Sequence, residues 1–256
     1  MGWIQVSKID HKDKGIKTPE GYSFARNTPF IPLLPFELSK CVTFMPIIFL
    51  QMTNGKKVVG LTSLKKENNV FVASNGSWRA PYIPARLRTY PFQFASLDQN
   101  VRTLVVYDDG KMLVDKTNGR ALFNDDGTES DFLQNALKLL KDIDAGEKQN
   151  HKILELFNEL NLFNSEPITI NLDGKKIRLE GAFSIDEEAF LGLTGKNLKK
   201  LQNSLGMHLI FAHFYSLGNL KDIISLQNVF EESAKKLQKL GASIFHEDNS
   251  FNWAND

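Results

Sequence analysis

The chain has 256 residues and a formal net charge of +1, from 31 basic and 30 acidic residues. Its 42% hydrophobic and 24% charged residues are typical of a folded globular protein and exclude a wholly disordered chain. The near-neutral charge balance gives no reason to expect a nucleic-acid partner. The single cysteine, Cys41, excludes an internal disulfide framework and a cysteine-based zinc site.

The first twenty residues alternate charged and apolar side chains and lack the unbroken apolar core of a secretory signal peptide. The most apolar helical run, residues 205–217, is too short for a membrane span, which takes about 20 residues. We therefore expect a cytoplasmic protein with no membrane span. Because this run is more apolar than one core-facing helix needs, a homodimer through it is a further hypothesis.

Asn-Gly and Asp-Gly pairs mark turns along the first half of the chain. Such pairs favour two-residue hairpin turns, because both central residues of those turns take positive φ. The pairs lie at residues 54–55, 75–76, 109–110 and 118–119, between runs rich in Val, Ile, Phe, Thr and Tyr. The pattern predicts an antiparallel β meander over about residues 41–124.

Helical spacing of apolar residues begins after Thr128, where Thr128 and Asp131 resemble a capping box. The apolar residues between 132 and 143 lie on one helical face, and Gly146 is predicted to end this helix. A second helix is predicted over about residues 153–160.

A hairpin is predicted next, around Asp173 and Gly174, and helices again from Asp186 onward. Asn219 is the predicted N-cap of a last helix that ends at Gly241. These elements predict an α+β fold, in which the antiparallel β meander of the N-terminal half packs against helices of the C-terminal half.

No Ser-, Gly- or Pro-rich linker divides the chain, so we expect a single domain over residues 21–245. Residues 1–20 are predicted to form a mobile N-terminal arm and residues 246–256 a mobile C-terminal tail.

The most distinctive segment is WRAPYIPARLRTYPFQF, residues 78–94, in which aromatic residues, arginines and prolines alternate. Arginine offers a planar fork for carboxylate or phosphate, and aromatic rings stack on sugar rings or bases. Prolines reduce the entropy lost on holding those groups in place. A site for an anion, a sugar or a partner is therefore predicted at Trp78, Arg79, Tyr82, Arg86, Arg88 and Tyr90.

A structural interpretation of this block stays open. The aromatic rings would then belong to the core, and the arginines would pair with acids. Residues 108–131 supply such acids, since they include seven acidic and three basic residues. Three guanidinium groups within about ten residues repel one another unless internal acids or an external anion neutralise them.

Other candidate sites have ordinary explanations. The acidic turns after residues 108 and 124 do not match a twelve-residue calcium loop. His208 and His213 are five residues apart, which places them on different faces of a helix and argues against a shared metal. No metal site and no cofactor are expected.

Nucleophile and nucleotide-loop signatures are missing from the sequence. Cys41 lies at the start of an apolar run and is predicted to be buried and slow to react. Asp186, Glu187 and Glu188 are predicted to open a helix, where acids favour its positive end.

Six segments of the sequence, in the same order and over about residues 22–224, resemble the SapC family, named for a protein encoded beside bacterial surface-layer export genes. Residues 225–256 look like an added helix and tail. The similar segments are FARNTPFIPLLPFEL, PIIFL, WRAPYIPARLRTYPF, LFNDDGTES, GAFSIDEE and AHFYSLGNL.

The resemblance implies a bacterial protein linked to the surface layer (S-layer) or to surface glycans, and it carries over no catalytic residue. Two functions stay open. The first is a non-catalytic accessory or binding protein of surface-layer or surface-glycan biogenesis, which docks a protein or glycan partner. The second is an enzyme that acts on a small anionic or sugar-containing substrate through the arginine and aromatic residues. The lack of a catalytic motif favours the first, whereas a deep pocket that held Arg79, Arg86 and Arg88 beside an acid or a histidine would favour the second.

Overall fold

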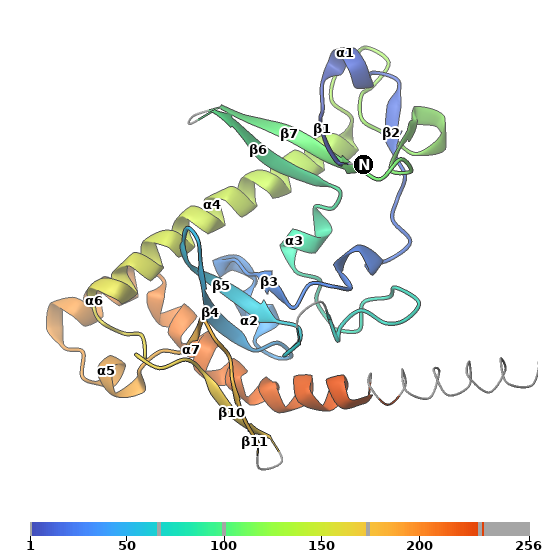
Figure 1. Cartoon of the computed structure of the whole chain (residues 1–256). Helices are drawn as coiled ribbons and strands as arrows, with labels where there is room; N and C mark the ends of the chain where they lie inside the picture. The colour runs from blue at the N-terminus through green and yellow to red at the C-terminus, as the bar shows by residue number, and fades with distance from the viewer. Residues whose placement is uncertain (1, 66–67, 99–100, 173–174, 230–231, 233–256) are drawn as a thin grey trace, which may run out of the picture.

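A computed structural model describes residues 2–65, 68–98, 101–172, 175–229 and 232 (Figure 1). Antiparallel sheets occupy mainly the N-terminal half and the long helices the C-terminal half, which confirms the α+β class. The strands are β1 (Gly2–Gln5), β2 (Lys14–Ile16), β3 (Phe30–Pro32), β4 (Ile47–Met52), β5 (Gly55–Leu61), β6 (Phe92–Asp98), β7 (Val101–Asp108), β8 (Leu113–Asp115), β9 (Arg120–Ala121), β10 (Thr169–Leu172), β11 (Lys175–Arg178) and β12 (Ala182–Phe183).

The helices range from single turns to one long helix. The α-helices are α1 (Lys8–His11), α2 (Leu38–Cys41), α3 (Ala85–Arg88), α4 (Asp131–Glu159), α5 (Glu187–Leu191), α6 (Gly195–Asn203) and α7 (Gly206–Ser216). Short 3-10 helices are η1 (Ser23–Ala25), η2 (Pro35–Glu37), η3 (Lys116–Asn118) and η4 (Leu217–Asn219).

The central sheet has the strand order β12-β4-β5-β3. Its β4–β5 hairpin turns at Asn54-Gly55, as predicted, and Gly55 has a φ of +92° that suits this turn. β10 and β11 form the predicted hairpin of the second half, although its turn at residues 173–174 lies outside the described residues. One face of the central sheet packs on α4 and α7 through Phe49, Val58 and Phe157.

The remaining strands between residues 41 and 124 divide between two smaller sheets instead of following one another in one sheet. β6 and β7 pair with β1, whereas β8 and β9 lie on either side of β2. The chain turns at Asp109-Gly110 as predicted, but β8 does not pair with β7. It pairs instead with β2, which comes from a distant segment of the chain, and turn signals do not reveal such long-range pairing.

The N-terminal segment therefore differs from the predicted mobile arm. Trp3 pairs with Tyr107 of β7, and Gly15 pairs with Val114 of β8 and Ala121 of β9. Residues 2–5 and 14–16 are strands of two sheets and belong to the folded domain. The predicted tail, residues 246–256, lies outside the described residues.

A single helix, α4, replaces the two helices predicted for residues 132–143 and 153–160. Ser130, not Thr128, is its N-cap, and its hydroxyl accepts from the Leu133 N–H over 3.3 Å. The predicted stop at Gly146 is wrong. A Cβ atom at Gly146 would lie 3.2 Å from Cβ of Leu34, so the glycine allows a close contact between α4 and the segment before η2.

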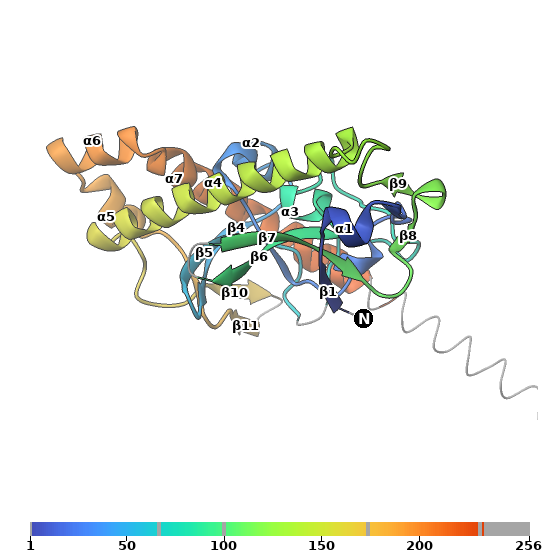
Figure 2. The ribbon, with the colours of Figure 1, turned by 90° about the horizontal axis from the view of Figure 1, so that it is seen from above.

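The length of α4 connects separate parts of the core. Near its start Leu133 and Leu140 pack with Phe92, and near its end Leu154 and Phe157 pack against the central sheet. Figures 1 and 2 show α4 running the length of the molecule, from the end where β1 and β2 lie to the end where α5 and α6 lie. The block at residues 78–94 enters the fold beside the middle of this helix.

Helices follow the central sheet in the last described part of the chain. α5 begins after Asp186, whose side chain accepts from the Ala189 N–H and acts as the N-cap, as the acidic run predicted. Residues 220–229 are helical, while the predicted end at Gly241 lies outside the described residues. The Asn219 side chain donates to the Val42 carbonyl over 2.9 Å and ties this turn to the end of α2.

Across the described part of the chain, no helix combines the length and the apolar composition that a membrane crossing requires.

Candidate functional site

The arginine and aromatic block begins against the core and then reaches the surface. Trp78 forms a β-bridge with Val72, and its ring lies 5.5 Å from that of Phe71, centroid to centroid. Its indole N–H donates to the Tyr82 carbonyl over 2.8 Å, which closes the loop between them. Trp78 is therefore packed against the main core. Arg79, next to it, is exposed.

Arg86 and Arg88 point in different directions, because both lie on the one-turn helix α3. Residues two apart on a helix are separated by about 200°, so they do not face each other. The Arg86 guanidinium forms an ion pair with Glu147 of α4. Arg88 Nη2 instead donates to the Tyr82 hydroxyl over 3.0 Å.

The acids of residues 108–131 do not neutralise these two arginines. Asp115 pairs with Lys14 over 2.8 Å, and Asp125 pairs with Lys116 over 2.7 Å. Asp108 accepts from backbone N–H groups in its own turn, which holds the pKa of that carboxyl below its usual range against the opposing effect of burial. The predicted pairing of arginines with internal acids thus occurs for Arg86, but with an acid of α4.

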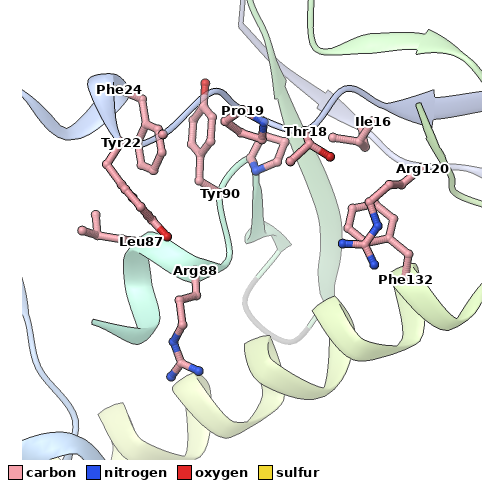
Figure 3. Close-up of a pocket in the computed structure, with 12 residues that line it drawn as sticks. Ile16, Thr18, Pro19, Tyr22, Phe24, Leu87, Arg88, Tyr90, Arg120 and Phe132 are labelled. Carbon is pink, nitrogen blue, oxygen red and sulfur yellow. The ribbon is translucent and has the colours of Figure 1, made fainter. Parts of the chain in front are cut away.

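A pocket of about 270 Å³ lies between the segment that follows β2, α3, β9 and the start of α4 (Figure 3). We call it the Arg88–Arg120 pocket. Figure 3 shows Arg88 extending toward α4 at one end and Arg120 lying beside Phe132 at the other. Much of the pocket wall is aromatic, and the four aromatic residues that line it are Tyr22, Phe24, Tyr90 and Phe132.

The charge of this pocket is positive. Among the described residues that line it, two are arginines and none is acidic. The Arg120 guanidinium carbon lies 4.1 Å from the Phe132 ring centroid, and Arg88 bonds to a neutral hydroxyl. Within the described part of the chain neither arginine has a carboxylate in ion-pair contact. Neither guanidinium group is therefore saturated by a carboxylate, so each can still bind an anion.

The aromatic wall is ordered by ring contacts. Phe24 and Tyr90 are stacked, with centroids 3.8 Å apart and planes 7° apart, and Tyr22 lies 5.9 Å from Phe24. Burial, with a smaller contribution from Asp109, raises the pKa of Tyr90, so its hydroxyl stays neutral near pH 7. Such a wall can contact the flat or apolar part of a small ligand.

A buried carboxylate, that of Glu37, lies behind Arg88. Its Oε1 accepts from the Leu34 N–H over 3.0 Å, and its Oε2 accepts from the Ala85 N–H over 2.8 Å and from the Tyr82 hydroxyl over 3.2 Å. Glu37 is completely buried, and burial raises the pKa of its carboxyl, while these hydrogen bonds and the Arg88 charge act in the opposite direction. Burial and the Glu37 charge raise the pKa of Tyr82 to about 12.

Of the six predicted site residues, the structure brings Arg88 and Tyr90 into one pocket and places Tyr82 directly behind Arg88. Trp78, Arg79 and Arg86 lie outside that pocket. The six residues therefore do not form one surface.

Sequence reasoning missed four residues of this region: Tyr22, Phe24, Glu37 and Arg120. For Glu37 a signal exists, because proline at the first position of a helical turn followed by Glu at the third is half of a capping box. For Arg120 no local signal exists, since pairing of β9 with β2 brings it to the pocket.

The remaining predicted candidates have structural roles. Cys41 is buried, and burial raises the pKa of its thiol. His213 is buried and hydrogen-bonded, whereas His208 is exposed, so the two do not share a ligand. In the described ranges of the chain, no three His, Cys, Asp or Glu residues are grouped so that they could hold a metal ion.

Comparison with known proteins places the chain by family. A search of curated proteins and a search of solved structures returned no match. The model of the SapC family matches residues 6–223 of the 256, a range that includes both the Glu37 turn and every residue that lines the Arg88–Arg120 pocket. The chain therefore belongs to the SapC family.

Proposed function

We propose that this protein is a non-catalytic accessory protein of bacterial surface-layer or surface-glycan biogenesis that binds a small anionic ligand in the Arg88–Arg120 pocket. The observation that carries the proposal is the composition of the wall: two arginines, four aromatic residues and, among the described lining residues, no acid. Guanidinium groups bind carboxylate and phosphate through paired hydrogen bonds, and aromatic rings contact the faces of sugar rings.

The size of the pocket limits the ligand. Pockets for drug-sized ligands have volumes of about 300–1,000 Å³, and this pocket has about 270 Å³. A single sugar unit that carries one acidic group suits the space better than an oligosaccharide. The link to surface layers or surface glycans rests on the family resemblance alone.

Binding suits the lining residues better than catalysis does. The side chains that most often transfer protons near neutral pH are those of His, Asp, Glu and Lys, and none of these lies among the described residues of the wall. Glu37 and Tyr82 are nearby, but both are engaged in hydrogen bonds behind Arg88. The enzymatic alternative would need an acid or base supplied from elsewhere.

We propose a cytoplasmic location, where the buried thiol of Cys41 would stay reduced. We also keep a homodimer through α7 as a proposal. Phe211 and Tyr215 of this helix are stacked with centroids 6.0 Å apart, and both are exposed, Tyr215 at 74%. Sedimentation of the full chain that shows monomer alone at high concentration would contradict the dimer.

The experiment for the pocket is calorimetric titration with inorganic phosphate, glucose 1-phosphate and glucuronate, with glucose as the neutral comparison. We expect the anions to bind and glucose not to bind. Arg88→Gln and Arg120→Gln should each weaken anion binding about 10- to 100-fold, because each loses a charge-assisted hydrogen bond worth about 1.5–3 kcal/mol.

The matched control is Arg178→Gln, because Arg178 is an exposed arginine of β11 that does not line the pocket. This variant should bind like the unchanged protein. Binding of none of the three anions, or equal affinity in all three variants, would contradict the proposal. Turnover of glucose 1-phosphate that the unchanged protein performs and Arg88→Gln lacks would favour the enzyme.

A further inference from the structure

Phe132 differs from the other aromatic residues of the Arg88–Arg120 pocket, because a cation covers one face of its ring. The Arg120 guanidinium carbon lies 4.1 Å from the Phe132 ring centroid. This distance is close to the carbon–carbon contact of about 3.5–4.0 Å, so the guanidinium carbon lies over the face of the ring and not beside its edge. A cation in this position is attracted by the electrons of the ring.

The pairing of β9 with β2 brings the Arg120 side chain to the pocket. Arg120 is the register partner of Ile16, and residues directly opposite each other in an antiparallel pair point to the same side of the sheet. Ile16 also lines the pocket. Figure 3 shows the Arg120 guanidinium next to the Phe132 ring, at the end of the pocket opposite Tyr22 and Phe24.

The Phe132 ring is held in place by the core beneath it. It lies 5.7 Å from the Phe92 ring, centroid to centroid, and packs against the cluster that contains Ile16 and Leu133. Phe132 is half-buried, whereas Arg120 is exposed. A long and exposed side chain therefore rests on a ring that has little freedom to move.

Ser130 connects the two segments that carry this pair. Its hydroxyl donates to the Ala121 carbonyl over 2.6 Å, and its N–H donates to the Leu122 carbonyl over 3.0 Å. Ala121 is the neighbour of Arg120 in β9, and Ser130 is the N-cap of α4, two residues before Phe132. These hydrogen bonds fix the strand and the start of the helix relative to each other.

The aromatic contact leaves hydrogen-bond donors of Arg120 available to a ligand. A guanidinium has five N–H donors and no acceptor, and the face of one ring takes up little of this capacity. Among the residues that the structure describes, no carboxylate is within ion-pair distance of Arg120. A carboxylate or phosphate can therefore accept two parallel hydrogen bonds from a guanidinium that is already held in place.

We infer that Phe132 is a positioning residue, whose ring holds the Arg120 guanidinium in place for an anion in the Arg88–Arg120 pocket. The inference rests on the proposed function, since it concerns the affinity of that pocket. It gives the Phe132 ring a task other than contact with a sugar face, which leaves Tyr22, Phe24 and Tyr90 for that contact. Holding the arginine in place beforehand reduces the side-chain entropy that is lost when the anion binds.

The test is a double-mutant cycle with Phe132→Leu and Arg120→Gln, in which glucose 1-phosphate is titrated into the full chain. Leucine keeps an apolar side chain in the cluster but removes the face of the ring. Phe132→Leu should weaken binding about three- to fivefold in the unchanged background, as expected for an exposed cation–π contact, and not at all in the Arg120→Gln background. An equal loss in both backgrounds would overturn the inference.

Two further variants separate the aromatic contact from an effect on the fold. Phe94→Leu changes a ring that packs against the same cluster but does not line the pocket, and it should leave affinity unchanged. Phe132→Tyr keeps the aromatic face and should bind within about twofold of the unchanged protein. A loss from Phe132→Tyr or from Phe94→Leu as large as that from Phe132→Leu would overturn the positioning role.

The inference and the proposed function fail in different ways. If Arg120→Gln weakens binding while Phe132→Leu does not, the pocket stands and the positioning role is overturned. If Arg88→Gln and Arg120→Gln both leave binding unchanged, the proposed function fails first, and the inference that rests on it fails with it.

Discussion

The Ala85 N–H donates to Oε2 of Glu37 over 2.8 Å, and this hydrogen bond joins two segments that are 48 residues apart. Ala85 is the first residue of α3, and Glu37 ends the turn η2. A buried side chain thus caps the helix that carries Arg86 and Arg88. The two segments FARNTPFIPLLPFEL and WRAPYIPARLRTYPF meet at this contact.

Glu37→Gln tests the importance of this contact for stability. The variant keeps the shape of the side chain, but an NH2 group replaces one oxygen and faces a donor. We expect the free energy of unfolding in urea to fall by about 2–3 kcal/mol, because a buried donor is left without an acceptor. Glu155→Gln, at an exposed position of α4, should change it by less than about 0.5 kcal/mol. Equal stability of Glu37→Gln and the unchanged protein would contradict the capping role.

His213 should make stability depend on pH. Its Nδ1 lies 2.7 Å from the Ile47 carbonyl, which can only accept, and the Ile185 N–H donates to its Nε2 over 3.2 Å. The folded protein therefore holds the neutral ring with its proton on Nδ1, and burial lowers the pKa of His213 to about 4. Below pH 6.5 the unfolded chain takes up a proton that the folded protein does not, so stability falls as the pH decreases toward 4.

The size of this effect follows from the difference between the two pKa values, at about 1.4 kcal/mol per unit, and amounts to about 3 kcal/mol. Since carboxyl groups titrate in the same range, the measurement compares urea unfolding of the unchanged protein and His213→Asn from pH 7 to pH 4. The stability difference between them should change by about 3 kcal/mol. A constant difference for His213→Asn would refute the assignment.

Gly146→Ala should destabilise the protein although alanine is the better helix former. Alanine in a helix interior is worth about 1 kcal/mol over glycine. The new Cβ would lie 3.2 Å from Cβ of Leu34, an atom that cannot move without its backbone. Overpacking typically costs about 1–3 kcal/mol, so we expect a net loss of about 1 kcal/mol in chemical unfolding.

The adjacent position of α4 provides the control. Ala145 is exposed, and Ala145→Gly should lose about 1 kcal/mol from helix propensity alone. The two opposite substitutions should therefore both destabilise the protein. A gain in stability from Gly146→Ala would show that Leu34 can move aside.

The same substitution should lower mainly stability at Arg86 and mainly anion affinity at Arg88. Arg86→Gln removes the ion pair with Glu147, in which both side chains are about one-third exposed. It should lower the free energy of unfolding by about 1 kcal/mol and leave the anion affinity unchanged. Arg88→Gln should weaken anion binding with a smaller effect on the melting temperature. Thermal unfolding and calorimetric titration of both variants check this, and the reverse pattern would exchange the two roles.

Local signals predicted the parts of the fold that depend on neighbouring residues. The turn at Asn54-Gly55 and the helix start at Asp186 depend on residues within a few positions, and both form as predicted. Gly146 was misjudged because the residue that requires a glycine there is Leu34, 112 positions earlier in the chain. A pattern within one segment does not contain that contact.

For the same reason, local sequence patterns predicted only part of the candidate site. Arg88 and Tyr90 belong to a segment whose composition stands out, whereas Arg120 reaches the pocket through the pairing of β9 with β2. The separation of Arg86 from Arg88 follows from helical geometry, but only once α3 is known to be a helix. The proline and glutamate pattern at Glu37 indicates a helix start, whereas the burial of its side chain becomes visible in the fold alone.

The unbroken course of α4 restricts how the length of this segment can change. Its first turns pack Leu133 and Leu140 into one cluster, and its last turns pack Leu154 and Phe157 into another. Each residue inserted into a helix rotates everything beyond it by about 100° and shifts it by about 1.5 Å. A single insertion between residues 141 and 152 would therefore turn one of the two apolar faces toward solvent, so this segment can accept substitutions but has to keep its length.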